Sequence, residues 1–363
     1  MKLKATLRLE NGLEFQGYSF GCAKAVGGEV VFNTSMMGYP EQLTDPTYNQ
    51  QILCLTYPLI GNYGVPSENL IAEALSEKLE SERIHPNGLI IFDYCEDYSN
   101  WEAEKSLEQW MNEQGLTGIY GIDTRELTRK IRDNGTCKVI FTSADTPADK
   151  AVEILNNTEI PNDAVKIVSC KKRWYSRTAN MKYNVVAIDC GIKLSLIRTL
   201  NSKGCNITVV PYDTTAEEVM KMKPDGIYIS DGPGNPEDIQ PVIELVKTLR
   251  GKCPIIGVGL GSEIIGLAYG AKTYKLKAGH RGCNHSVRSL INNTLRNHLQ
   301  NHGYAIDASS IEGTELTVTH INVFDKTVEG ISCEKDNVYG VQYLPSECST
   351  FYERFINLMK GDK

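Results

Sequence analysis

Residues 254–263 (PIIGVGLGSE) contain the pattern most closely tied to chemistry: a β-branched run that ends in a glycine-rich turn and continues into a helix. A strand, tight turn and helix of this form present one residue at the apex of the turn, and hydrolases place a nucleophile there. The apex residue in this chain is Gly259, which has no side chain. The sequence therefore predicts the backbone of a nucleophilic site without the nucleophile.

The same glycines could instead form a phosphate-binding loop. The dinucleotide pattern G-x-G-x-x-G needs a third glycine, but that position holds Ser262 when the count starts at Gly257 and Ile264 when it starts at Gly259. A P-loop also needs G-K-[ST], which does not follow the turn. The spacing argues against a nucleotide site here.

The elements that must position this turn alternate regularly in the second half of the chain. Short apolar strands are expected at 185–189, 206–210, 226–230 and 254–258, and helices at 192–203, after Thr215 and after the pair Asn235-Pro236. This alternation predicts a parallel, doubly wound α/β sheet, in which ligands bind at the carboxyl ends of strands. The turns at 230–234 and 257–263 both fall at such ends.

The first half of the chain predicts a mixed α/β domain. Strands are expected at 4–9 and 89–92, a helix at 101–115, and a second helix that opens with a capping box at Asp123 and ends at Gly135. Between about 143 and 182 the periodicity is lost among Pro and Asn clusters. The predicted division is therefore an N-terminal domain at 1–145, a linker at 146–183 and a C-terminal domain at 184–363.

Composition excludes several classes of function. The formal net charge of −7 and the lack of a long Lys/Arg-rich run argue against nucleic-acid binding. No stretch has the length and apolarity of a membrane span, and the N-terminal residues lack a signal-peptide core. The 11 cysteines form no C-x-x-C pair, so neither a metal site nor a disulfide scaffold is expected, and a cytoplasmic location fits best.

Several longer motifs occur in a fixed order along the chain. In the second half these are SDGPGNP at 230–236, GVGLG at 257–261, GHRGCNH at 279–285, NHGY at 301–304 and GVQYLPS at 340–346. In the first half they are FNTSMMGYPEQLTDPTY at 32–48, LTYPLIGNYG at 55–64 and GIDTR at 121–125. The series resembles the small chain of carbamoyl phosphate synthetase, a class I glutamine amidotransferase family, over nearly the whole chain.

The resemblance implies hydrolysis of glutamine, with the ammonia passed to a large chain for carbamoyl phosphate synthesis in the pyrimidine and arginine pathways. A cysteine in the elbow G-x-C-x-G-H-Q attacks the carboxamide, and the histidine and glutamate of a late H-P-E motif act as base and orienting group. This chain departs at each slot, which hold Gly259, Leu344 and Ser346. The nucleophile, the base and the orienting group are all missing, so glutaminase activity is expected to be lost.

The resemblance also implies a set of glutamine-contacting positions. Most keep a compatible residue type, but Glu263 stands where the family has glutamine, so weakened or lost glutamine affinity is expected, with the carboxyl group paired or partly solvated. The positions are Ser35, Gly232, Gly234, Leu260, Glu263, Asn301, Gly303 and Tyr304.

These features favour a non-hydrolysing, structural or regulatory small subunit in a heterodimer with the large chain. No cofactor is expected in this chain, while ATP and magnesium are expected on the large chain. Two alternatives stay open: a stand-alone glutamine-binding or sensor module, and an active glutaminase with a relocated nucleophile such as Cys283 or Cys348. The histidines His280, His285 and His302 are expected to hold loops through hydrogen bonds.

Overall fold

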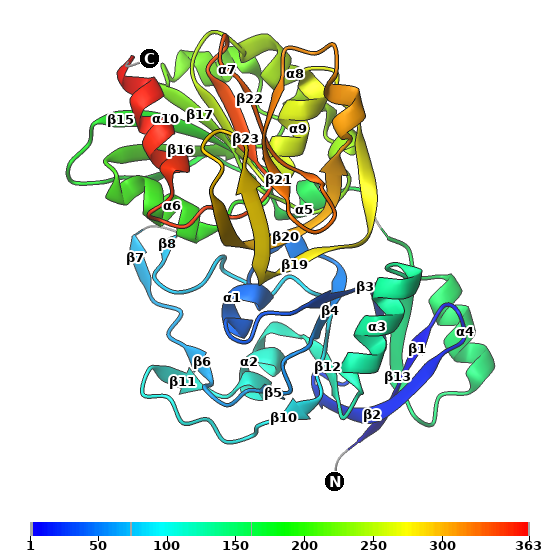
Figure 1. Ribbon diagram of the computed structural model, residues 1–363. Helices are drawn as coiled ribbons and strands as arrows, with labels where there is room; N and C mark the ends of the chain where they lie inside the picture. The colour runs from blue at the N-terminus through cyan, green and yellow to red at the C-terminus, as the bar shows by residue number, and fades with distance from the viewer. Residues whose placement is uncertain (1–2, 73–74, 161, 362–363) are drawn as a thin grey trace. The chain divides into compact units, whose positions relative to one another are not determined.

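The computed structural model describes residues 3–72, 75–160 and 162–361, which belong to two compact units (Figure 1). The first unit comprises Met1–Leu70 and Ser76–Pro161, and the second comprises Ile71–Leu75 and Asn162–Lys363. Among the described residues, no helix is both long and apolar enough to cross a membrane.

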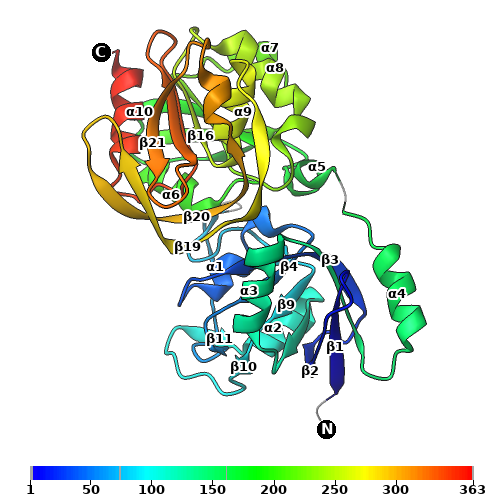
Figure 2. The same cartoon turned by 45° about the vertical axis from the view of Figure 1, so that its right-hand side comes forward.

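The first unit is built around a closed barrel, seen with α2 and α3 in Figure 2. The barrel order is β1 (Lys4–Leu9), β13 (Lys138–Ser143), β3 (Val26–Asn33), β4 (Gln51–Leu55), β9 (Gly88–Ile90), β12 (Thr117–Tyr120) and β2 (Glu14–Gly21). The helices are α1 (Tyr39–Leu43), the 3-10 turn η1 (Pro46–Tyr48), α2 (Leu107–Gln114), α3 (Thr124–Asn134) and α4 (Ala148–Asn156). Short strands are β5 (Leu59–Ile60), β6 (Val65–Pro66), β7 (Leu70–Ala72), β8 (Leu75–Ser76), β10 (Asp93–Tyr94) and β11 (Ala103–Lys105).

Successive residues of the barrel strands enter two different apolar clusters. Val30 and Ile52 pack in one cluster with Leu127 of α3, whereas Val31 and Leu53 pack in the other with α2. This follows from the two-residue period of a strand, which sends neighbouring side chains to opposite faces. The mixed α/β prediction for this half is confirmed, although the sequence did not indicate that the strands close into a barrel.

Two helix predictions in the first half have different outcomes. The helix after Asp123 is confirmed as α3, and the Asp123 carboxylate accepts a hydrogen bond from the Glu126 N–H at 2.8 Å. The helix expected at 101–115 is wrong in its first six residues, because α2 begins only after Ser106, whose hydroxyl accepts from the N–H of Gln109. The preceding β11 pairs with β6 instead, and Trp101 is exposed.

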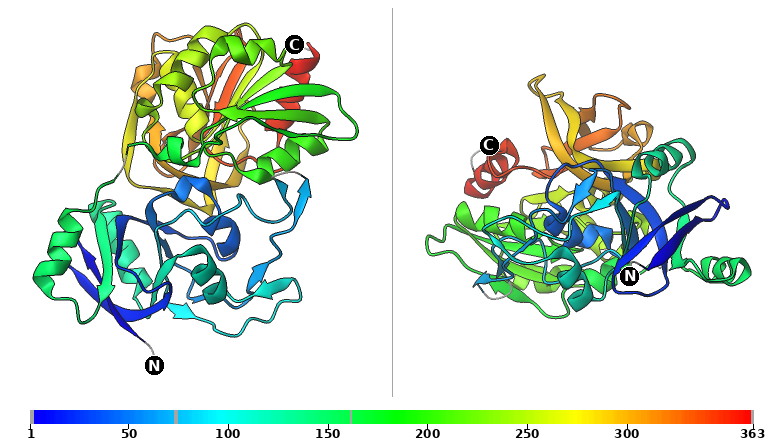
Figure 3. Two further views of the ribbon diagram at one scale, coloured as in Figure 1. Left: turned by 180° about the vertical axis from the view of Figure 1, so that it is seen from behind. Right: turned by 90° about the horizontal axis from the view of Figure 1, so that it is seen from below.

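The second unit contains a ten-stranded sheet with helices on both faces (Figure 1, Figure 3). The sheet order is β14 (Trp174–Ser176), β16 (Cys205–Pro211), β15 (Tyr183–Asp189), β17 (Gly226–Ile229), β18 (Ile255–Val258), β23 (Val338–Val341), β22 (Val328–Cys333), β21 (Thr317–Asn322), β19 (Thr273–Ser289) and β20 (Leu295–Ile306). The helices are α5 (Ala164–Val168), α6 (Leu194–Ser202), α7 (Ala216–Lys221), η2 (Pro236–Asp238), α8 (Gln240–Leu249), α9 (Leu260–Ala268), η3 (Ala308–Ile311) and α10 (Thr350–Lys360).

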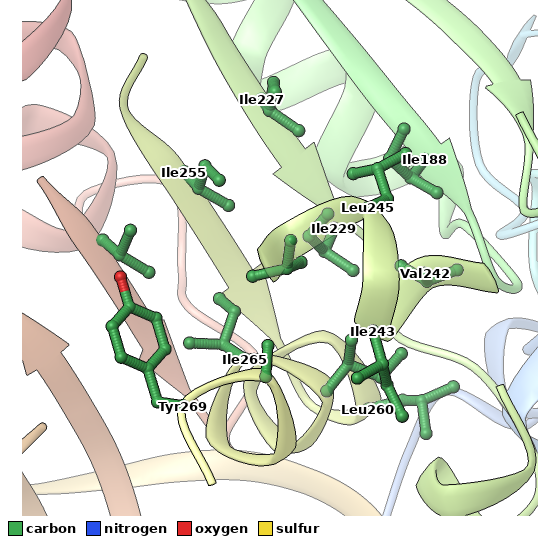
Figure 4. Close-up of a cluster of buried hydrophobic side chains, with 14 of the residues drawn as sticks. Ile188, Ile227, Ile229, Val242, Ile243, Leu245, Ile255, Leu260, Ile265 and Tyr269 are labelled. Carbon is green, nitrogen blue, oxygen red and sulfur yellow. The ribbon is translucent and has the colours of Figure 1, made fainter. Parts of the chain in front are cut away.

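The five strands from β16 to β23 run parallel and form the doubly wound centre that the sequence predicted. Ile227 and Ile229 of β17 face α8 and α9 in the cluster drawn in Figure 4, whereas Tyr228 faces the cluster that contains α6 and α10. A parallel strand that is buried on both faces needs an almost continuous apolar run, which is what the sequence shows.

Two further differences from the sequence predictions concern connecting segments. Asn235 caps the 3-10 turn η2 rather than a helix, and α8 begins at Gln240 after a break at Ile239. The expected linker at 146–183 contains regular elements: α4 in the first unit, and α5 and β14 in the second. Strand β14 pairs antiparallel with β16 at the edge of the sheet, a long-range contact that the local pattern does not encode.

Candidate functional site

The turn at Gly259 has the backbone of a nucleophile elbow. Gly259 follows β18 and precedes α9, with φ 54° and ψ −118°, a conformation that glycine adopts freely and that L side chains rarely adopt. The N–H of Gly259 donates to the carbonyl of Val341 on the neighbouring strand at 2.8 Å. Gly257 and Gly261 are needed because a Cβ on either residue would overlap backbone atoms. The elbow is therefore retained at the level of the main chain.

The segment after β23 holds the other two slots of the predicted triad. Leu344 is partly buried against the apolar cluster of α6 and α10, and its N–H donates to the carbonyl of Leu299 at 2.9 Å. Ser346 is exposed to solvent, and its carbonyl accepts from the N–H of Ser349. Neither residue type can serve as a general base of the kind that a thiol nucleophile requires.

The two thiols considered as replacement nucleophiles lie elsewhere in the second unit. Cys283 is exposed on the long strand β19, and Cys348 is exposed in the segment between β23 and α10. Neither belongs to the strand–turn–helix that presents Gly259.

A buried ion pair that the sequence did not predict lies beside the elbow. Asp231 follows β17, and its Oδ2 is 3.0 Å from Nζ of Lys193, with both side chains almost completely buried. Its Oδ1 accepts hydrogen bonds from the N–H groups of Gly232 and Leu260, at 2.8 and 3.1 Å. A signal was present in the sequence, because a lysine within an apolar run such as 185–200 requires an acidic partner if it is buried.

Glu263 on the first turn of α9 is buried and paired. Its Oε1 accepts from Nε2 of Gln342 at 2.7 Å. Burial raises the pKa of Glu263 to about 8, since the stabilising hydrogen bond from Gln342 is outweighed and the nearby charge of Asp231 raises it further. Of the two expectations for this carboxyl group, pairing is observed and partial solvation is not, because only 2% of the residue is exposed.

The histidines of β19 and β20 form a hydrogen-bonded cluster. His280 Nε2 lies 2.8 Å from Asp325 and Nδ1 lies 3.6 Å from Glu329. Burial alone would lower the pKa of His280, but the hydrogen bond with Asp325 and the proximity of the Glu329 carboxylate raise it to about 9. His302 contacts the Tyr304 carbonyl through Nδ1 at 2.7 Å, and burial lowers its pKa well below the usual range.

This cluster is also the place where a cation could be held. Ligand atoms of His280, His302 and Glu329 all lie within 4.8 Å of one another. A His280 imidazolium between Asp325 and Glu329 supplies the positive charge that the two carboxylates need, and it has no lone pair to offer a metal ion. The histidine therefore offsets part of the negative charge that would otherwise attract a cation to this cluster.

Comparison with known proteins agrees with this geometry over both units. Residues 7–141 match the family model "Carbamoyl-phosphate synthase small chain, CPSase domain", and residues 186–354 match "Glutamine amidotransferase class-I". The chain is 42% identical over 356 residues to the carbamoyl phosphate synthase small chain of Fusobacterium nucleatum, with 96% of each chain covered. The chain belongs to the carbamoyl phosphate synthase small-chain family.

Two other members of this family show similar agreement. The pyrimidine-specific small chain of Bacillus subtilis is 42% identical over 364 residues, which cover 99% of this chain and 96% of that one. The small chain of Listeria monocytogenes is 41% identical over 366 residues, which cover 99% and 97%. The predicted family and fold class are thus confirmed, with a glutamine amidotransferase domain in the second unit.

Apart from Glu263, which is described above, the predicted glutamine-contacting positions of this small-chain family member fall into three groups. Gly232, Gly234 and Leu260 lie at the ends of the adjacent strands β17 and β18, where Leu260 begins α9. A Cβ on Gly232 would overlap the carbonyl of Cys190, and Gly234 has φ 93°, so both positions require glycine.

The second group lies on β20, and the third belongs to the other unit. Asn301 pairs in register with Arg281 of β19 and is buried, while Gly303 and Tyr304 are partly buried. Ser35 lies in the first unit just after β3, where its N–H donates to Oδ1 of Asn33 at 2.7 Å. Its buried Oγ has no hydrogen-bond partner among the residues that the structure describes.

Proposed function

We propose that this chain is a small subunit of carbamoyl phosphate synthase that does not hydrolyse glutamine. It would dock on a large chain in a heterodimer and support that chain's structure or regulation while the large chain uses free ammonia. The observation that carries the proposal is the elbow at Gly259, which keeps the main-chain geometry of a nucleophile turn while the three chemical slots hold Gly259, Leu344 and Ser346.

The proposed loss affects the catalytic side chains and leaves the main chain of the elbow in place. The glycines of the elbow still allow the close backbone approach that they allow in a working hydrolase turn. Acyl transfer from a side-chain amide needs a thiolate, a base and an orienting group, and the residues in the three slots supply none of them. Burial of Glu263 beside Asp231 adds acidic groups near the position where a glutamine ligand would lie.

Membership of the small-chain family supports the remaining parts of the proposal. The partner would be the large chain, on which ATP and magnesium would bind, and the product would serve pyrimidine or arginine synthesis in the cytoplasm. We also propose that this chain binds glutamine with reduced affinity, because Glu263 is uncharged near neutral pH but cannot reproduce a glutamine amide.

The test is reconstitution with the large chain, with either glutamine or ammonium as the nitrogen source. Carbamoyl phosphate should form with ammonium and not with glutamine, and a family member that carries the Cys, His and Glu of the triad should use both. Glutamine-dependent synthesis by this chain at a rate comparable with that control would overturn the proposal.

Two measurements separate the alternative functions. A glutamine-analogue electrophile that labels Cys283 or Cys348 stoichiometrically would indicate a relocated nucleophile. Tight glutamine binding by calorimetry, together with no association with a large chain, would indicate a stand-alone sensor.

A further inference from the structure

Two main-chain N–H groups beside the elbow point at a single oxygen atom. The N–H of Gly232 and the N–H of Leu260 donate to Oδ1 of Asp231, at 2.8 and 3.1 Å. The two donors come from different connections, one after β17 and one after β18, which are neighbours in the sheet. The Gly232 contact is local, because Gly232 directly follows Asp231, whereas the Leu260 contact depends on the neighbouring positions of β17 and β18 in the sheet.

These donors have the properties of an oxyanion hole. In a nucleophile elbow, the N–H of the residue after the apex is one of the donors that stabilise a developing negative charge, and Leu260 is that residue. Donors of this kind act at 2.7–3.1 Å from the oxyanion, the range observed here for a carboxylate oxygen. Leu260 also begins α9, and the N-terminus of a helix favours an anion.

We propose that Asp231 is a built-in ligand of this chain's own oxyanion hole, where its carboxylate takes the position that the acyl oxygen of a substrate would need. The site is therefore a pocket that can bind a small carboxylate, and the side chain of Asp231 occupies it. This inference rests on the proposed function and deepens it, because it gives a second obstacle to acyl transfer besides the missing triad.

Lys193 fixes the carboxylate in this position. Its Nζ lies 3.0 Å from Oδ2 of Asp231, and the two side chains are only 2% and 3% exposed. Separating such a pair would leave uncompensated charges in a low-dielectric interior. Moving the carboxylate out of the oxyanion hole therefore carries a high free-energy cost. Charge-assisted bonds to an ammonium and two N–H groups are stronger than those that a neutral amide substrate could offer in exchange.

The apex glycine and the internal carboxylate fit each other. A Cβ added to Gly259 would lie 2.5 Å from Cγ of Asp231 and closer still to its Oδ1. A thiol at the apex and the carboxylate in its present place would therefore compete for the same space.

The test removes the internal ligand and offers an external one of the same chemistry. In the full-length Asp231→Ala variant, sodium formate should raise the melting temperature, with a gain that grows with the logarithm of formate concentration. Formate should also shift the amide resonances of Leu260 and Gly232 in the variant. The wild-type chain should show neither response, because its hole is filled.

The controls separate an anion site from general effects. Sodium chloride at the same ionic strength and neutral formamide should not reproduce the formate response. The double variant Asp231→Ala/Lys193→Met should respond less, because it lacks the ammonium group. Unchanged Leu260 and Gly232 resonances in folded Asp231→Ala at high formate would overturn the inference, whatever the reconstituted complex does with glutamine.

A second variant applies if Asp231→Ala does not fold. Asp231→Asn keeps the shape but removes the negative charge, so the amide protons of Leu260 and Gly232 should both move upfield as their hydrogen bonds weaken. Amide protons that stay at the wild-type positions would show that they do not bind the Asp231 carboxylate. Glutamine is absent from all these experiments, so their failure is distinct from failure of the proposed function.

Discussion

Gln342 donates through Nε2 to Oε1 of Glu263 at 2.7 Å, which joins the segment after β23 to the first turn of α9. Both residues are almost completely buried. The pair lies one turn of helix from the elbow at Gly259, and the raised pKa of Glu263 makes the stability of the protein depend on pH.

The free energy of unfolding should fall as the pH rises from about 4.5 to about 8. Burial raises the pKa of Glu263 to about 8, so the folded chain keeps a proton that the unfolded chain, with its ordinary value of 4.5, releases. The isosteric Glu263→Gln variant should lose this dependence and be more stable than wild type at pH 8, which urea unfolding at several pH values would measure. Glu347→Gln, at an exposed position, is the matched control, and an equal flattening by that variant would contradict the assignment.

Gly259→Ala should destabilise the protein more than Gly270→Ala does. Both glycines have positive φ, at 54° and 92°, but a Cβ at Gly270 would meet no atom within 4 Å, whereas one at Gly259 would overlap Asp231. The backbone term should cost about 1–3 kcal/mol at Gly259, whose ψ of −118° lies outside the left-handed helical region, and overlap should add about 1–3 kcal/mol there. Equal losses in thermal or urea unfolding would show that Asp231 does not fill that space.

Gly259→Cys alone should not produce glutaminase activity. The new thiol would have neither a base nor an orienting group, because Leu344 and Ser346 hold those positions, and it would overlap Asp231. Ammonia release from glutamine, followed in the isolated chain and in the complex, should stay at the wild-type background. Hydrolysis clearly above that background would show that another residue serves as the base, which would contradict the assignment of the base position to Leu344.

His280 should titrate near pH 9 and support the fold below that value. Burial lowers the pKa of His280, but the hydrogen bond with Asp325 and the nearby Glu329 carboxylate outweigh it and raise the pKa above the ordinary 6.5. The contribution of His280 to stability is therefore complete below pH 6.5 and is lost as the pH rises through 9. Asp325→Asn should lower the pKa of His280, which NMR titration of the imidazole resonances would follow. A titration midpoint of His280 that the Asp325→Asn variant leaves unchanged would argue against this pairing.

The sequence predicted those parts of the molecule that depend on local pattern. The apex position of Gly259 and the alternation of strands and helices after residue 184 follow from side-chain periodicity and glycine spacing. The closed barrel of the first unit was not predicted, because its closure depends on pairs such as β1 with β13 and β12 with β9, which lie far apart in the sequence. The ion pair of Lys193 with Asp231 was missed for the same reason, since only the order of β15, β17 and β18 brings their connections together.

The fit between Gly259 and Asp231 restricts the order in which substitutions can accumulate in this lineage. Any side chain at the apex needs the space of the carboxylate, and removal of the carboxylate first takes the buried Lys193 away from its ion-pair partner. A side chain at residue 259 and the carboxylate of Asp231 therefore exclude each other, and either single change is expected to lower the free energy of unfolding. Substitutions at the two positions should accordingly be non-additive, with a coupling that a double-mutant cycle of Gly259→Ala and Asp231→Ala would measure.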